Sequence, residues 1–202
     1  MPVDRFLRLA IPTMFAGIAI GLLYAVFSAT SDGSNRDRIA RLAIGEFVKL
    51  DFSDRGADAP SAPFADAEGD LTTYQDFEGQ ALVVNFWATY CAPCIHEMPT
   101  LAALQTSRGG EDFKVITISV DIPEVREDAE AMLRELSGGA LDFYALADGP
   151  QGWDVVYESG ATGGFPTTVL YNKAGTKIAK LEGIADWAGY EAVALVDALR
   201  EN

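Results

Sequence analysis

Residues 85–94 read NFWATYCAPC and hold both cysteines of the chain, Cys91 and Cys94. The apolar run 81–86 (ALVVNF) that leads into them is typical of a buried strand, and a helical pattern follows them directly. At the start of a helix, unpaired amides and the helix dipole favour the first sulfur as a thiolate. A thiolate is the species that attacks disulfides, so this spacing predicts reversible disulfide exchange.

The regions on both sides of this motif alternate between strand and helix patterns. We expect a hairpin at 63–77 and short helical turns at 153–159, with the other elements as follows: strands 82–86, 113–120, 143–147, 167–171 and 177–181, and helices 92–105, 123–136 and 190–199. Strands that alternate with helices and end in a hairpin predict an α/β fold, with a mixed central sheet flanked by helices.

The N-terminal region contains a stretch without any charged residue, 9–31. Its apolar centre, 11–29, would reach roughly 30 Å as a helix, which matches one hydrocarbon core. A cleaved signal peptide is the alternative, since Arg5 and Arg8 could form its basic end, but such apolar regions are shorter, about 7–15 residues. We therefore predict a transmembrane anchor at 9–31 after a short cytoplasmic tail, 1–8.

Residues 32–61 are predicted to connect this anchor to the domain. Apolar residues at spacings of three to five predict an amphipathic helix over 35–50. The stretch 51–62 is rich in Asp, Ala, Ser and Pro, as linkers are. The folded domain is then expected over 62–202.

The charge of the chain narrows the classes of partner. A net charge of −15 with a single histidine repels nucleic acid and anionic lipid.

A structural zinc site needs about four ligands, and the chain offers two sulfurs and His96, which a helix would point away from Cys94. We expect no metal site and no nucleic-acid partner.

The segment NFWATYCAPCIHEMP (85–99) resembles the active site of the TlpA/ResA/DsbE group, which are membrane-anchored, extracytoplasmic thiol–disulfide oxidoreductases. The stretches GFPTT (164–168), NKAG (172–175) and GIADWA (183–188) also resemble this group, and the layout is most similar to TlpA. The resemblance covers about residues 60–202. It implies a thioredoxin-like fold in the periplasm behind an inner-membrane anchor, with no cofactor beyond a redox-active Cys91–Cys94 disulfide.

The same resemblance assigns a substrate-binding surface. It implies that Pro166 follows a cis peptide bond and faces the disulfide, and that Phe165 offers backbone groups to an extended substrate segment. Trp87 and Tyr90 are expected to form the apolar rim of this surface.

The cysteines have distinct expected roles. Cys91 should be the more exposed, attacking sulfur, and Cys94 should resolve the mixed disulfide. The resemblance implies that Asn85 occupies the position at which cytoplasmic thioredoxins carry a buried aspartate. An amide cannot act as a base, so Asn85 cannot take over the role of that aspartate. Glu97 is then the nearest carboxylate and a candidate for proton transfer, although a solvated or helix-capping role is favoured.

The resemblance implies that the chain reduces disulfides of periplasmic partner proteins during cytochrome c or cytochrome oxidase maturation. A membrane electron donor would then have to reduce the pair again. Two alternatives on the same fold stay open: a copper-binding assembly factor, which Cu(I) titration would detect, and a thiol peroxidase, which peroxide consumption would detect.

Overall fold

The computed structural model describes residues 20, 22, 23 and 38–201. The chain divides into two compact units, Met1–Ala40 and Arg41–Asn202. Within the described residues no helix is both long and apolar enough to cross a membrane. The predicted tail at 1–8 and almost all of the predicted anchor at 9–31 lie outside the described residues.

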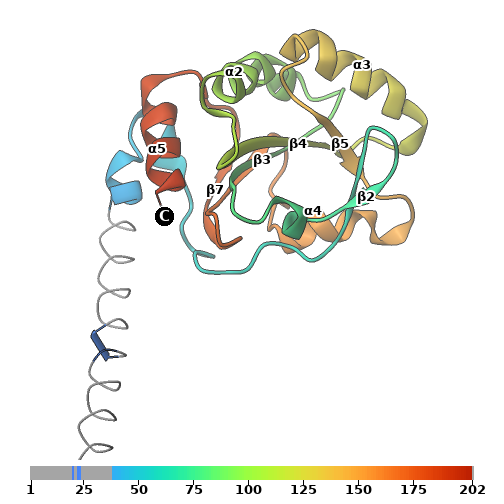
Figure 1. The fold of residues 1–202 in the computed structure, drawn as a ribbon. Helices are drawn as coiled ribbons and strands as arrows, with labels where there is room; N and C mark the ends of the chain where they lie inside the picture. The colour runs from blue at the N-terminus through green and yellow to red at the C-terminus, as the bar shows by residue number, and fades with distance from the viewer. Residues whose placement is uncertain (1–19, 21, 24–37, 202) are drawn as a thin grey trace, which may run out of the picture. The chain divides into compact units, whose positions relative to one another are not determined.

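The second unit is built on a sheet of seven strands in the order β2-β1-β5-β4-β3-β6-β7 (Figure 1). Strands β3, β4 and β5 run parallel to one another, and the remaining pairs are antiparallel. The strands are β1 (Phe64–Asp66), β2 (Leu71–Thr72), β3 (Ala81–Trp87), β4 (Phe113–Ser119), β5 (Phe143–Leu146), β6 (Thr167–Tyr171) and β7 (Lys177–Glu182).

Helices flank this sheet. Figure 1 shows α2 (Ala92–Arg108) and α3 (Arg126–Ser137) on one side of the strands and α4 (Asp154–Glu158) on the other. Among the described residues the other helical segments are 38–42, α5 (Tyr190–Arg200) and four 3-10 helices: η1 (Gly45–Lys49), η2 (Tyr74–Phe77), η3 (Pro123–Val125) and η4 (Pro150–Trp153). The predicted α/β architecture with a mixed sheet is confirmed.

The helix predicted over 35–50 is wrong in its described part. Residues 38–42 are helical, but the helix ends before Ala43, and a separate 3-10 helix, η1, begins at Gly45. Between them, Ile44 is extended, with φ −117° and ψ 170°, and Gly45 has a φ of +60° in the left-handed region, so neither residue continues a right-handed helix. The segment that follows pairs with β7 through an isolated bridge between Asp51 and Lys180.

The registers of the central strands bring the predicted site residues to one edge of the sheet. The parallel pair β3–β4 places the end of β3, Trp87, opposite Ser119. The antiparallel pair β3–β6 places Phe86 opposite Thr167. Pro166 therefore lies directly before β6, at the same end of the sheet as the C-terminal end of β3. Carboxyl ends of parallel strands are the usual location of binding sites in α/β sheets.

Candidate functional site

Cys91 and Cys94 form a disulfide at the N-terminus of α2. Cys91 is the N-cap residue, and its Sγ accepts a hydrogen bond from the Cys94 amide at 3.3 Å. Cys91 is 9% exposed and Cys94 is 1% exposed, so the prediction that Cys91 is the more accessible sulfur is confirmed. The helix dipole and the Cys94 amide both favour negative charge on Cys91 once the pair is reduced.

Asp121, just beyond β4, holds the loop that leads into Cys91. Its carboxylate accepts hydrogen bonds from the Thr89 amide at 2.9 Å, from the Thr89 hydroxyl at 2.8 Å and from the Ser119 hydroxyl at 2.8 Å. The Asp121 side chain is largely buried, so each contact replaces a hydrogen bond to water. The loop between β3 and Cys91 is therefore fixed to the neighbouring strand.

We expect Asp121→Ala to lower the free energy of unfolding by about 2–3 kcal/mol, because buried donors lose their acceptor. It should also slow disulfide exchange, because the loop that positions Cys91 is no longer fixed to the neighbouring strand. Urea denaturation and a peptide-disulfide reduction assay measure the two effects. Asp148→Ala is the matched control, because Asp148 pairs with Arg126 but is 73% exposed, and it should cost at most about 1 kcal/mol. Equal losses in both variants would contradict the assigned role of Asp121.

Tyr90, Phe165 and Pro166 were predicted to bind the substrate, and the structure shows their backbone and exposure. The Phe165–Pro166 peptide bond is cis, as the family resemblance implied. Tyr90, directly before Cys91, is 75% exposed, and Phe165 is half-buried. Tyr90 thus adjoins Cys91 in the sequence, and Pro166 precedes β6 at the end of the sheet where β3 ends.

Trp87 does not belong to this surface. Its side chain is fully buried, so the prediction that it forms part of the apolar rim is corrected. All seven residues of β3 are buried, because this central strand is covered on both faces. Trp87 lies at the end of that strand and packs in the core beneath the site.

Glu97 lies one helical turn after Cys94 and is 1% exposed. The favoured expectation of a solvated or capping carboxylate is therefore wrong. Its Oε1 accepts hydrogen bonds from the Trp187 indole N–H and from the Ala185 amide. Burial raises the pKa of Glu97 to about 7, and the hydrogen bonds and the charge of Lys49 oppose that shift only in part.

The neighbouring Asn85 leaves a further polar group unpaired. Its Nδ2 donates to the Thr168 hydroxyl at 2.9 Å. Among the described residues, neither Asn85 Oδ1 nor Glu97 Oε2 has a hydrogen-bond partner. The Asn85 side chain favours the ionised form of Glu97 and so opposes the effect of burial on the pKa of Glu97.

We expect Glu97→Gln to change how stability depends on pH. Below pH 4.5 the carboxyl is protonated in both the folded and the unfolded chain, so burial carries no ionisation cost. From pH 4.5 to about 7 the unfolded chain releases this proton first, and the wild type loses about 3 kcal/mol of stability. Glutamine cannot ionise, so the variant's stability relative to the wild type should rise between pH 5 and pH 8.

Urea denaturation of the oxidised chains at pH 5, 6, 7 and 8 measures this difference. Glu68→Gln, at an exposed turn, is the control that should follow the wild type at every pH. A constant difference between Glu97→Gln and the wild type across this range would show that the Glu97 carboxyl is not perturbed.

The described part of the chain contains no group of three or more His, Cys, Asp or Glu side chains that could hold a metal ion. His96 is exposed, whereas the neighbouring Cys94 is buried. Those residues therefore lie in different environments on α2.

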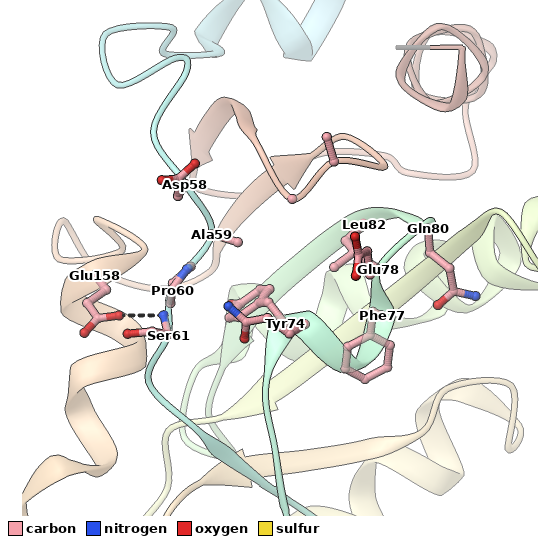
Figure 2. A pocket seen from close by; sticks show the side chains of 13 residues that line it. Asp58, Ala59, Pro60, Ser61, Tyr74, Phe77, Glu78, Gln80, Leu82 and Glu158 are labelled. Atoms are coloured by element: carbon pink, nitrogen blue, oxygen red, sulfur yellow. Dashed lines mark hydrogen bonds between the residues drawn. The ribbon is translucent and has the colours of Figure 1, made fainter.

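A cavity of about 710 Å³ lies at the other end of β3, away from the cysteines (Figure 2). It lies between the segment 58–61 and the side chains of Tyr74 and Phe77. Glu158 also lines the cavity, and its Oε2 accepts hydrogen bonds from the Ser61 and Ala62 amides. Neither cysteine is among the residues that line this cavity.

Two residues of the site were not predicted from the sequence. Asp121 directly follows the strand predicted at 113–120, a position at the end of the parallel strands from which the loop to Cys91 also begins. Trp187 belongs to the stretch 183–188, which the family resemblance marked without a role. Its contact with Glu97 joins residues 90 positions apart, so no local pattern could indicate it.

Comparison with known families identifies one match. The model of the AhpC/TSA family matches residues 55–179, a range that includes both cysteines and Pro166.

Individual relatives carry more specific names. A thiol-disulfide oxidoreductase ResA from Halalkalibacterium halodurans is 30% identical over 143 residues, which cover 68% of this chain and 77% of that protein. ResA from Bacillus thuringiensis subsp. konkukian is 27% identical over 139 residues, with coverage of 69% and 76%. Among solved structures, the thioredoxin domain of a thiol-disulfide oxidoreductase from Bacteroides vulgatus shares the fold, with a TM-score of 0.58, 23% identity and coverage of 71% and 95%.

Proposed function

Because the chain belongs to the AhpC/TSA family, and within it to the TlpA/ResA/DsbE-like thiol–disulfide oxidoreductases, we propose that it reduces disulfides of partner proteins in the periplasm. The observation that carries the proposal is the Cys91–Cys94 disulfide at the start of α2, with Cys91 the more exposed sulfur. This arrangement suits nucleophilic attack by one sulfur and resolution by the other.

The exchange proceeds in two steps. The Cys91 thiolate attacks one sulfur of a partner disulfide, so a mixed disulfide forms, the partner's own S–S bond breaks, and the released partner thiolate takes a proton. Cys94 then loses its proton and its thiolate attacks the Cys91 sulfur, which breaks the mixed disulfide and releases the second partner thiolate, and this thiolate takes a proton in turn. The partner gains two electrons and two protons, and the Cys91–Cys94 pair is oxidised.

Glu97 is the proposed acceptor for the Cys94 proton. Both side chains are buried and lie one turn apart on α2. A carboxyl with a pKa near 7 is close to half ionised at neutral pH, so it can both take up a proton and return it. Asn85 cannot replace it, because an amide does not titrate, and the Asn85 side chain favours the ionised form of Glu97 that accepts the proton.

The partner is proposed to bind as an extended segment beside the disulfide. Backbone groups at Phe165 and the turn at Pro166 suit β-type pairing with a peptide. Tyr90 adds an exposed aromatic contact next to Cys91. Sulfur exchange then fixes the register of the bound segment.

We further propose a compartment, an electron donor and a class of substrates for the chain. An anchor at 9–31 would hold the domain at the periplasmic face of the inner membrane, where disulfides persist. A reductant in that compartment needs recharging, so a membrane electron donor is its proposed second partner. Cysteine pairs that await haem or copper during cytochrome c or cytochrome oxidase maturation are the proposed substrates.

The test is reduction of a defined substrate by the full chain. The chain is reduced, freed of reductant and mixed with a peptide that contains one disulfide. We expect one peptide disulfide to be reduced for each Cys91–Cys94 pair that is oxidised. Absence of peptide reduction, with hydrogen peroxide consumed or Cu(I) bound tightly instead, would contradict the proposal and favour one of the two alternative functions.

A further inference from the structure

The carboxyl of Glu97 is held by a loop from the far end of the chain. Trp187, which is fully buried in the loop after β7, donates its indole N–H to Glu97 Oε1. The Trp187 amide also donates to the Thr100 hydroxyl at 3.1 Å, which ties the loop to α2 a second time. The position of the indole is therefore fixed relative to the helix that carries both cysteines.

Helix η1 covers the outer side of this loop. The ring of Phe47 meets the ring of Trp187 edge-on, with centroids 5.0 Å apart and planes at 73°. Lys49 Nζ donates to the Ile184 carbonyl at 2.9 Å, and the Asp186 amide donates to Glu46 Oε2 at 2.7 Å. Phe47 is only 2% exposed, so its ring is buried against the indole.

We propose that Trp187 is a positioning residue for the redox site, which holds the Glu97 carboxyl beneath the cysteines, and that η1 keeps water away from this contact. The proposal rests on the proposed function, because it assumes that Glu97 takes part in exchange. It extends the site to a segment that precedes the catalytic cysteines by more than forty positions in the sequence.

The two contacts act on Glu97 in opposite directions. The indole N–H stabilises the carboxylate, so its loss should raise the pKa of Glu97 further. Burial is the largest cause of the raised pKa of Glu97, and Phe47 packs on the indole that contacts Glu97, so water entry after the loss of Phe47 should lower this pKa. Opposite shifts from two adjacent substitutions would not follow from a general loosening of the structure.

The charged groups around Glu97 are few. Lys49 from η1 is the cation that favours the carboxylate. The loop 184–187 and β3 bring neutral groups to it, the Ala185 amide, the Trp187 indole and the Asn85 side chain. On α2 the titrating neighbours are Cys91 and Cys94 once the pair is reduced. Glu46 and Asp186 are exposed on the outside of the loop, and His96 is exposed on α2.

The experiment compares Trp187→Phe and Phe47→Leu in the full chain. Both variants keep an apolar side chain, which limits the loss of stability. Trp153→Phe and Phe113→Leu are the matched controls. Trp153 is a partly exposed tryptophan after β5, and Phe113 is a buried phenylalanine at the start of β4, at the other end of the strands from the cysteines. The Glu97 carboxyl is titrated by ¹³C NMR of the oxidised chain and assigned with Glu97→Gln.

We expect the Glu97 midpoint to rise by about one pH unit in Trp187→Phe and to fall in Phe47→Leu. The controls should leave it in place. The pH profile of peptide-disulfide reduction should move in the same direction in each variant, and Glu97→Gln should lack that inflection. Unchanged midpoints, or shifts of the same sign in both variants, would overturn the proposal.

Shifted midpoints with an unchanged pH profile of reduction would also overturn it, because the contact would then be structural only. In each of these outcomes the wild-type chain still reduces the peptide. Failure of the proposed function is a different result, in which the wild-type chain reduces no disulfide at any pH.

Discussion

Cys91→Ser is expected to slow peptide-disulfide reduction by at least about a hundredfold, to the background rate. The hydroxyl of serine is not ionised near neutral pH, so neither the helix dipole nor the Cys94 amide can produce a nucleophile at this position. Cys94 is 1% exposed and cannot replace Cys91 as the attacking sulfur. Reduction kinetics with an excess of peptide disulfide measure the loss.

Cys94→Ser is the matched variant. Its Cys91 can still attack, but no second sulfur is available to resolve the product, so the chain should accumulate as a mixed disulfide. Mass spectrometry should find the peptide on Cys91. In cell extract the same variant should capture the partner protein and so identify the substrate. Normal reduction by Cys91→Ser would show that the roles of the two sulfurs are reversed.

Trp87→Ala is expected to lower the free energy of unfolding by about 3–5 kcal/mol. The side chain is fully buried at the end of β3, and its removal leaves a cavity beneath the loop that carries Cys91. Trp87→Phe should cost much less, about 1 kcal/mol, because Trp87 Nε1 has no hydrogen-bond partner among the described residues. Urea denaturation of the oxidised chains measures both values.

Tyr90→Ala provides the opposite pattern. Its side chain is 75% exposed, so the free energy of unfolding should change by less than about 0.5 kcal/mol. The KM for a peptide disulfide should rise instead. A Trp87→Ala variant that keeps full stability but binds the peptide weakly would restore Trp87 to the substrate surface.

The sequence predicts the architecture well where local patterns are strong. The apolar run at 81–86 and the alternating run at 113–120 became β3 and β4, because strand periodicity is a property of consecutive residues. The amphipathic pattern at 35–50 did not predict one helix correctly, because the backbone conformation of Gly45 breaks the described part of it.

The site is predictable in its sulfur chemistry and less so in its surroundings. The spacing of Cys91 and Cys94 at a helix start indicated exchange from residue types alone, whereas the cis bond before Pro166 came only from the family resemblance. Glu97 was expected to be solvated because most glutamates are exposed. Its burial depends on Trp187, a residue 90 positions away, and such a contact exists only in the folded chain.

The reduction potential of the Cys91–Cys94 pair tests the central claim most directly. The full chain is equilibrated with glutathione buffers of graded potential, and the reduced fraction is measured by alkylation and mass spectrometry. A reductant for periplasmic disulfides should have a potential below about −200 mV. A potential near the DsbA value of about −120 mV would make the pair an oxidant and would contradict the account.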